Sequence, residues 1–221
     1  MRLHMLLKGP KQSIIPFNYQ PGLTGAIHKW IGKNNDVHDS MSLYSFSWLF
    51  GGRPLSTGIM FPKGARFFFS AFDSHILRKL ISGIKNDPEV AFGFRVSDIV
   101  ICEPPEFEME SIEFRYGSPI FVKRTISNKA VHYTFAQPES DRLLTETLRN
   151  KLSKAGLSVE GVSVAFKRDY PGARTKVIYY KDVGNRVNLC PVVVKGTPEQ
   201  LAFAWDVGVG NSTGIGFGAL Q

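Results

Sequence analysis

The feature of this sequence that most constrains its fold is an order of strands and helices that occurs twice. In the first half, alternating apolar residues predict an opening strand at about 3–7, and apolar residues at three- and four-residue spacing predict a helix at about 21–33. Strands at about 42–49 and 65–71, a second helix at about 76–84 and strands around 90–102 follow. The order strand–helix–strand–strand–helix–strand is that of a split βαβ, or ferredoxin-like, unit.

The second half repeats this order. Strands near 120–122 and 131–135 precede a helix at about 139–155, and strands at about 162–166, 177–180 and 187–195 follow it. A short helix then begins with Thr197 as N-cap and Pro198 at the first helical position, before a final short strand. We therefore predict an α+β fold of tandem ferredoxin-like (RRM-like) βαββαβ halves, residues 1–104 and 105–221.

The charge balance favours an anionic partner. The chain has 27 Lys and Arg against 19 Asp and Glu, a formal net charge of +8. This excess makes a polyanion such as a nucleic acid the default candidate, although many basic proteins bind none. The two cysteines, Cys102 and Cys190, have no CxxC or Cys/His spacing typical of a metal site, so we expect no metal and no cofactor.

The same features indicate where the protein works. Two isolated cysteines are typical of a reducing compartment. The N-terminal apolar run is too short for a signal peptide, and no stretch of about 18 apolar residues is long enough to cross a membrane. We expect a cytoplasmic protein with no membrane partner, while a domain cut from a longer fusion stays an alternative.

A glycine-rich segment lies one strand before the end of the sequence, with five glycines between residues 208 and 218. Glycine permits positive φ and lets backbone N–H groups approach an anion closely. The simplest interpretation is a tight structural loop. A nucleotide-binding module is a weaker alternative, because the segment lacks the Gly-Lys-Ser/Thr ending of a P-loop and does not connect a strand to a helix as GxGxxG does.

This segment, DVGVGNSTGIGFG at 206–218, closely resembles the C-terminal glycine-rich loop of the CRISPR-associated repeat-processing endoribonucleases of the RAMP superfamily. The N-terminal region is similar to the same family: PFNY at 16–19 and His38, which precedes the predicted strand LYSFS at 43–47. The resemblance implies metal-independent cleavage of precursor CRISPR RNA by the RNA's own 2′-hydroxyl, leaving a cyclic phosphate and a 5′-hydroxyl. It also implies CRISPR repeat RNA as partner, with a CRISPR effector complex and a second copy of the chain as further candidates.

Such cleavage needs a base, an acid and positive charge at the phosphorane, and histidine titrates near working pH. The resemblance makes His38 the first catalytic candidate and His28 the second. On a continuous helix they would lie about 15 Å apart, so we expect the chain to fold back at 32–35. Relatives often carry a lysine shortly after the histidine, but this chain has DSMS at 39–42. Lys29, Lys33 or the glycine-rich segment would then supply the charge.

The second half contains several basic clusters, one of which also includes Lys151. The predicted RNA-binding residues are Lys33, Lys123, Arg124, Arg142, Arg149, Lys167, Arg168 and Arg174, together with Gly208, Gly210, Asn211, Ser212, Gly214 and Gly216. Phosphate contacts of this kind hold RNA without reading its sequence. Any single cluster is also consistent with an ordinary solvated face.

One rival function stays open. The missing lysine after His38 also suits a catalytically silent RAMP-type RNA-binding subunit of a CRISPR effector complex. Repeat binding without cleavage would distinguish this subunit from the endoribonuclease.

Overall fold

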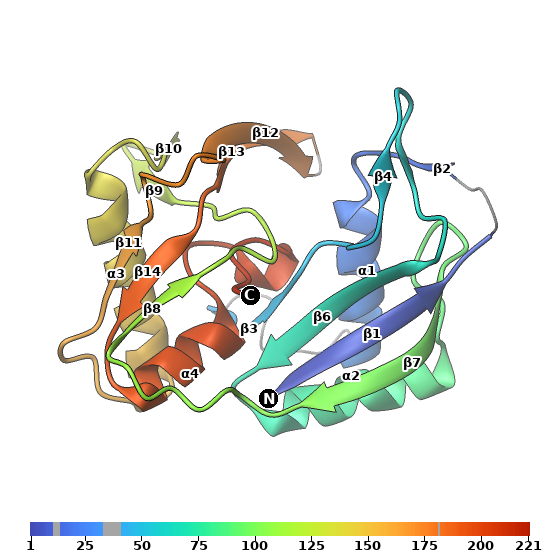
Figure 1. Cartoon of the computed structure of the whole chain (residues 1–221), viewed down its shortest axis with the longest axis horizontal. Helices are drawn as coiled ribbons and strands as arrows, with labels where there is room; N and C mark the ends of the chain where they lie inside the picture. Colours follow the sequence, from blue (N-terminus) through green and yellow to red (C-terminus); the bar gives the residue numbers. More distant parts are fainter. Residues whose placement is uncertain (11–13, 33–40, 181) are drawn as a thin grey trace.

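The first half is a four-stranded antiparallel sheet covered on one face by two helices (Figure 1). The structure is a computed structural model that describes residues 1–10, 14–32, 41–180 and 182–221. Its first elements are β1 (Arg2–Lys8), β2 (Ile14–Ile15), α1 (Gln20–Ile31), β3 (Tyr44–Phe46), β4 (Arg53–Pro54), β5 (Ile59–Met60), β6 (Ala65–Ala71), α2 (Ser74–Asn86) and β7 (Arg95–Cys102). The sheet order β3-β6-β1-β7 is ferredoxin-like.

The second half has the same connectivity with two hairpins inserted among its described residues. Its elements are β8 (Ser111–Phe114), β9 (Lys123–Ile126), β10 (Lys129–His132), α3 (Glu139–Lys154), β11 (Ser163–Phe166), β12 (Arg174–Tyr180), β13 (Val183–Leu189), β14 (Val192–Lys195), α4 (Pro198–Val207) and the 3₁₀ turn η1 (Thr213–Ile215). The sheet order is β11-β14-β8, and the fourth strand is reduced to a bridge between Tyr116 and Leu220. The predicted tandem ferredoxin-like fold is confirmed.

Two predicted strands differ in detail. The strand expected at 187–195 is two strands, β13 and β14, because Pro191 lacks the N–H needed to continue a ladder and the chain changes sheet there. The segment 120–122 forms one bridge, Ile120 with Asn188, rather than a strand.

Each half has its own apolar cluster. In the first, Leu3 and Met5 of β1 point toward α1 and α2 and are fully buried. In the second, Leu144 and Leu148 of α3 are equally buried against the sheet. The period of two along β1 and of about four along α3 is what the sequence pattern predicts. No helix among the described residues is long and apolar enough to cross a membrane.

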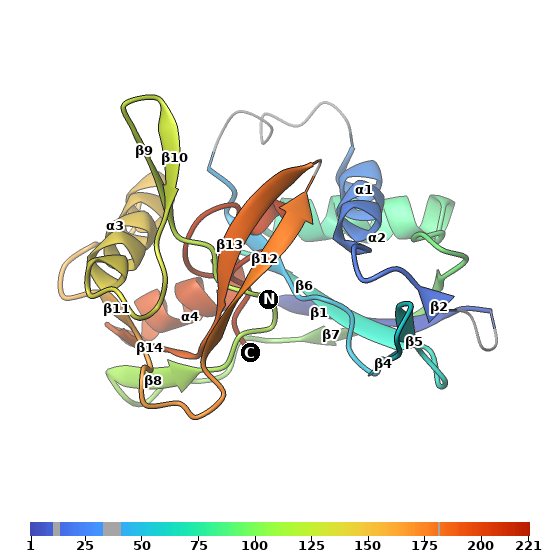
Figure 2. The ribbon, with the colours of Figure 1, turned by 90° about the horizontal axis from the view of Figure 1, so that it is seen from above.

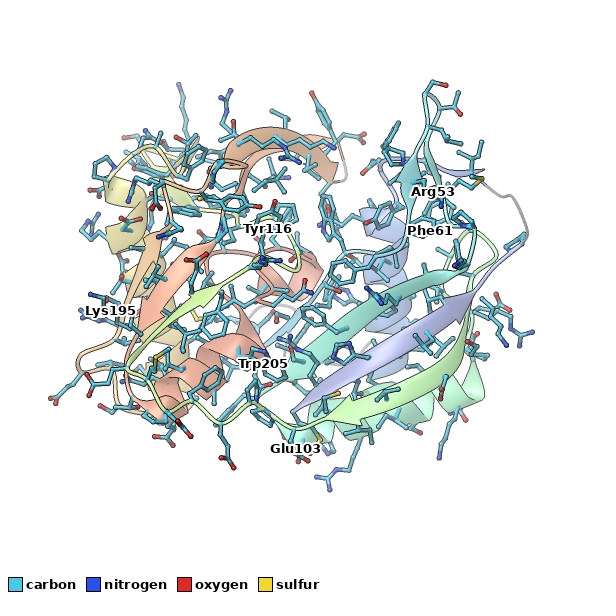
Figure 3. The ribbon with its side chains drawn as sticks, viewed as in Figure 1. Arg53, Phe61, Glu103, Tyr116, Lys195 and Trp205 are labelled. Atoms are coloured by element: carbon cyan, nitrogen blue, oxygen red, sulfur yellow. The ribbon has the colours of Figure 1, made fainter. Side chains whose placement is uncertain are left out.

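A buried arginine joins the halves. The Arg2 guanidinium lies between the rings of Phe68 on β6 and Trp205 on α4, 3.8 Å and 3.5 Å from their centroids. It donates hydrogen bonds of 2.8 Å to the carbonyls of Trp205 and Leu220, and burial lowers its pKa to about 9. Trp205 can be seen at this junction in Figure 3. The end of the chain is therefore fixed against its first strand.

Candidate active site at the glycine-rich loop

The glycine-rich loop, residues 208–218, is largely buried between the two halves. Gly210 and Gly218 have φ of +76° and +68°, and a Cβ at either position would collide with a backbone carbonyl, that of Phe121 or Val209. The N–H groups of Val209 and Gly218 donate to the carbonyls of Gly218 and Pro119 at 2.9 and 2.8 Å. The glycines thus permit backbone-to-backbone packing, which agrees with the structural-loop interpretation.

Helix α1 holds this loop with one row of polar side chains. Gln20, Thr24 and His28 follow one another at four-residue spacing and therefore share one face of the helix. The first two donate to the carbonyl of Ile215 at 2.6 and 3.4 Å. His28 Nε2 lies 3.0 Å from the carbonyl oxygen of Gly214. The predicted catalytic histidine thus meets the glycine-rich loop directly.

The contact with Gly214 determines where His28 carries its proton. A carbonyl oxygen only accepts, so the hydrogen bond requires a proton on Nε2. In the neutral imidazole the basic nitrogen is then Nδ1. The loop therefore selects one tautomer of a residue that is half-buried on α1.

Two tyrosines that the sequence did not single out lie in the same place. The hydroxyl of Tyr44 on β3 lies 3.5 Å from His28 Nε2 and 3.4 Å from the Gly214 carbonyl, and burial raises its pKa to about 12. Tyr180, at the end of β12, hydrogen-bonds Thr24, and burial raises its pKa as well. Figure 2 shows the β12–β13 hairpin reaching from the second half toward α1. Tyr44 lies in the LYSFS strand that carries the resemblance, but nothing in the sequence marked its hydroxyl as part of the site.

Of the other residues proposed for catalysis, the structure describes only Lys29. His38 and Lys33 lie outside the described residues. Lys29 Nζ donates to Asp87 Oδ2 and to the Glu89 carbonyl, both at 2.7 Å, and this contact lowers the pKa of Asp87. The structure therefore directs Lys29 toward the end of α2 rather than toward the loop. Ser42, four residues after His38 in sequence, does reach the site, since a Cβ on Gly214 would collide with its hydroxyl.

Lys151 was expected in a surface cluster, but it is buried. Its side chain is 2% exposed, and its Nζ donates to the carbonyls of Val207 and Gly208 and to Thr213 Oγ1, at 3.0, 3.2 and 3.2 Å. Burial lowers the pKa of Lys151 to about 7. The sequence pattern misplaced this residue because a lysine on a largely polar helix is usually solvated.

The lowered pKa predicts a pH-dependent stability. Between pH 7 and about 10.5 the unfolded lysine keeps a proton that the folded one has lost, so the unfolded state binds more protons. The free energy of unfolding should then rise with pH in this window, by up to about 1.4 kcal/mol per unit. Urea unfolding of wild type and Lys151→Met at pH 6, 8 and 9.5 checks this. In the difference between their free energies of unfolding, the contribution of every other titrating group cancels. A difference that stays constant with pH contradicts the prediction.

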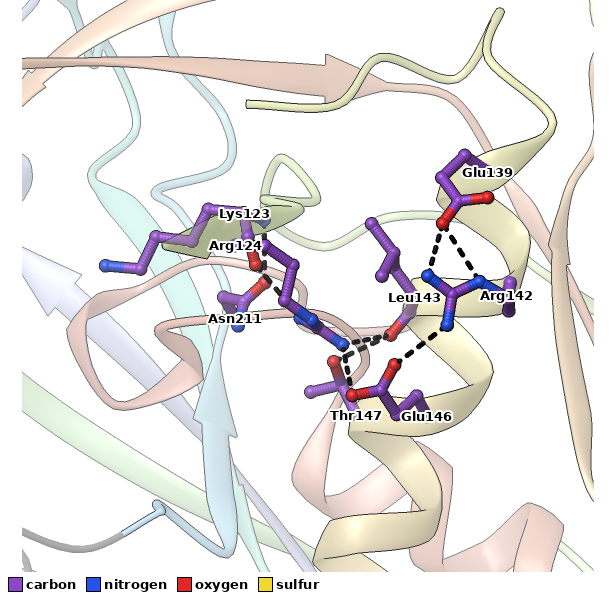
Figure 4. A network of polar contacts seen from close by, with 8 residues as sticks. All are labelled: Lys123, Arg124, Glu139, Arg142, Leu143, Glu146, Thr147 and Asn211. Carbon is purple, nitrogen blue, oxygen red and sulfur yellow. Dashed lines mark hydrogen bonds and ion pairs between the residues drawn. The ribbon is translucent and has the colours of Figure 1, made fainter. Parts of the chain in front are cut away.

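Four basic candidates of the second half are paired with carboxylates, and Figure 4 shows the pairs of two of them, Arg124 and Arg142. Arg124 and Arg142 both contact Glu146, at 3.1 and 3.4 Å, and Arg142 also pairs with Glu139. Lys167 pairs with Asp169 and Glu113, and Arg168 with Asp141. Ion pairs at the surface contribute little to folding stability, so these cations can exchange a carboxylate for an RNA phosphate.

The remaining candidates make neutral contacts. Arg149 and Arg174 donate to the carbonyls of Val162 and Gly172. Asn211 Oδ1 accepts from the Lys123 N–H at 2.8 Å, which ties the glycine-rich loop to β9. Ser212 is half-exposed in the left-handed region, and Gly208 and Gly216 have positive φ and are buried.

A basic cavity in the first half was not predicted. It has a volume of about 440 Å³ and includes Arg53, Lys63 and Arg66 beside the apolar side chains of Leu6 and Phe50. Figure 3 labels Arg53 near the β4–β5 hairpin. Among the described residues, no group of three or more His, Cys, Asp and Glu side chains is placed to hold a metal ion.

Comparison with solved structures supports the fold over the whole chain. A structure described as CRISPR associated protein Cas6 superposes with a TM-score of 0.84 at 20% identity, covering 100% of this chain and 98% of that one. A Cas6-related protein from Pyrococcus furiosus gives 0.86 at 21% identity, with 100% and 97% covered. A RAMP protein described as binding different RNA substrates gives 0.83 at 20% identity, with 100% and 98% covered.

Comparison at the level of sequence gives the family. No curated protein matches the chain. The family described as CRISPR associated protein Cas6, C-terminal, matches residues 102–221, which is more than half of the sequence and includes α3, α4 and the glycine-rich loop. This chain therefore belongs to the Cas6 family of CRISPR-associated proteins.

Proposed function

We propose that this protein is an endoribonuclease that binds CRISPR repeat RNA and cleaves precursor CRISPR RNA within the repeat. The observation that carries the proposal is the contact between His28 and the glycine-rich loop, because it places a titratable imidazole beside Tyr44 where the two halves meet. Two further solved structures of the same fold, with TM-scores of 0.66 and 0.63, are described as Cas6 product complexes. Family membership makes RNA processing the expected role.

The proposed chemistry needs no group outside RNA and protein. The 2′-hydroxyl loses its proton to a base and attacks the adjacent phosphorus, while the 5′-oxygen leaves with a proton from an acid. The products are a 2′,3′-cyclic phosphate and a 5′-hydroxyl. His28 and His38 are the two proton-transfer groups in this proposal. Since Asp87 holds Lys29, Lys33 is the better candidate for charge at the phosphorane.

RNA binding would use both halves. The second half offers the cations of β9, α3 and β12, which include Lys123, Arg149 and Arg174. The first half offers the basic cavity, where Phe50 gives an apolar surface beside Arg53 and Arg66. Phosphate contacts and stacking on aromatic rings are the usual means of holding single-stranded RNA. The net charge of +8 suits such a partner.

Cleavage of the host's CRISPR repeat RNA in EDTA tests the proposal. We expect the wild type to cut once per repeat, and His38→Ala to bind equally well but cut at least about 100-fold more slowly. A repeat with a 2′-deoxy nucleotide before the cut should bind and stay intact. Cutting of that deoxy substrate would refute attack by the 2′-hydroxyl.

One alternative has an observation in its favour. The chain lacks a lysine at 39–42, and Lys29 forms an ion pair with Asp87. Few residues are therefore left to place positive charge at the phosphorane. A catalytically silent RAMP-type subunit that holds guide RNA in an effector complex would show this pattern. Tight repeat binding with no cleavage by the wild type would favour it.

A further inference from the structure

Lys151 is a buried lysine of the second half. It projects from α3, is 2% exposed, and all three of its hydrogen-bond partners are uncharged. A methionine of similar length could fill the same space. Burying a charge is costly unless its hydrogen bonds are satisfied, so lysine at this position is poorly explained by packing alone.

The geometry suits an ammonium group. Below pH 7, where Lys151 is protonated, its three N–H donors match three acceptors, the carbonyls of Val207 and Gly208 and the hydroxyl of Thr213. Val207 and Gly208 are the last residue and the C-cap of α4, where the helix dipole favours a positive charge. The Nζ thereby fastens both the beginning of the glycine-rich loop and the start of η1.

The loop connects Lys151 to the candidate active site. Thr213, which Lys151 holds from the side of α3, directly precedes Gly214. The Gly214 carbonyl accepts from His28 Nε2 at 3.0 Å and lies 3.4 Å from the Tyr44 hydroxyl on the opposite side of the loop. A shift of Thr213 would therefore move the acceptor that orients the His28 ring.

We propose that Lys151 is a positioning residue: through Thr213 it fixes the glycine-rich loop so that the Gly214 carbonyl sets the orientation and the tautomer of His28. The effect on cleavage rests on the proposed endoribonuclease function. The effect on the His28 ring does not, so the two can fail separately.

The test compares Lys151→Met with Val194→Ala. Methionine keeps the length and apolar volume of the stem but removes the three donors. Val194 on β14 is fully buried and pairs with Val164 and Ile112 in the sheet, so its truncation loosens the same half and removes none of the hydrogen bonds of Lys151. Each variant is measured for melting temperature, repeat binding, single-turnover cleavage from pH 5.5 to 8.5, and the imidazole ¹⁵N shifts of His28, assigned with His28→Gln.

We expect Lys151→Met to bind repeat RNA within about threefold of wild type and to cleave at least about tenfold more slowly than Val194→Ala. The His28 ring should change from the Nε2–H form to a mixture of tautomers, and the pH profile of cleavage should move with it. A rate loss no larger than that of Val194→Ala, or an Nε2–H signal that persists in Lys151→Met, overturns the proposal.

Two safeguards keep the result interpretable. If Lys151→Met does not fold, Thr213→Val removes one of the three acceptors at nearly constant volume and should shift the His28 tautomer in the same direction, by less. An unchanged tautomer in Thr213→Val then counts against the proposal. If the wild type does not cleave repeat RNA, the proposed function fails, and the ¹⁵N shifts alone decide the role of Lys151.

Discussion

His28→Ala should cleave repeat RNA at least about 100-fold more slowly than the wild type while binding it within a few-fold. A positioned general acid or base contributes about 10²–10⁴ to a rate. The contact of His28 with the glycine-rich loop gives the variant a second effect, since loss of a hydrogen bond to Gly214 should cost about 1 kcal/mol of stability. Single-turnover cleavage at saturating protein, with a melting curve for each variant, separates the two effects.

Two variants make this result decisive. His28→Gln can still donate to the Gly214 carbonyl but cannot transfer a proton near neutral pH, so it should restore stability and leave the rate low. His75→Ala removes an exposed imidazole from α2 and should behave as wild type. Cleavage by His28→Gln at the wild-type rate would leave His28 a structural role only.

Gly218→Ala should destabilise the fold by at least about 3 kcal/mol. The residue has φ of +68°, a region that costs an L-residue about 1–2 kcal/mol, and the added Cβ would overlap the Val209 carbonyl oxygen. That oxygen belongs to the backbone, so relief requires the whole glycine-rich loop to move. The free energy of unfolding in urea measures the loss.

Gly156→Ala is the matched control. Gly156 has φ of +74°, close to that of Gly218, but nothing lies within 4 Å of a Cβ placed there. Gly156→Ala should lower the free energy of unfolding by about 1 kcal/mol, because it carries only the cost of placing an L-residue at positive φ. Equal losses in the two variants would mean that close packing of the glycine-rich loop contributes nothing.

The fold was largely predictable, because periodicity is a local signal. Alternation in β1 and four-residue spacing in α3 each follow from which face meets a core, and the repeated order of elements then gives the ferredoxin-like halves. The break at Pro191 was missed, since one proline between two apolar runs does not reveal that the runs join different sheets.

The site was predictable only where a motif marked it. The glycine spacing predicted a tight loop, and the resemblance singled out His28, which the structure places against that loop. Tyr44 and Lys151 reach the same loop from β3 and α3, over sequence separations of 170 and 62 residues. No local pattern encodes contacts of that range. The catalytic role of His38 stays a prediction.

The bonds between the first and last strands bear on how the protein is made. Arg2 donates to the Leu220 carbonyl across 218 positions, and the N–H of Gln221 pairs with the Arg115 carbonyl to complete the second sheet. The ribosome makes these partners long after β1, at roughly 5–20 residues per second. The contacts that join the two halves therefore form only after α4 and Leu220 have emerged, and until then Phe68 stays uncovered by Trp205. The nascent chain should depend on chaperones that shield this face, and truncation by a few C-terminal residues should harm both halves at once.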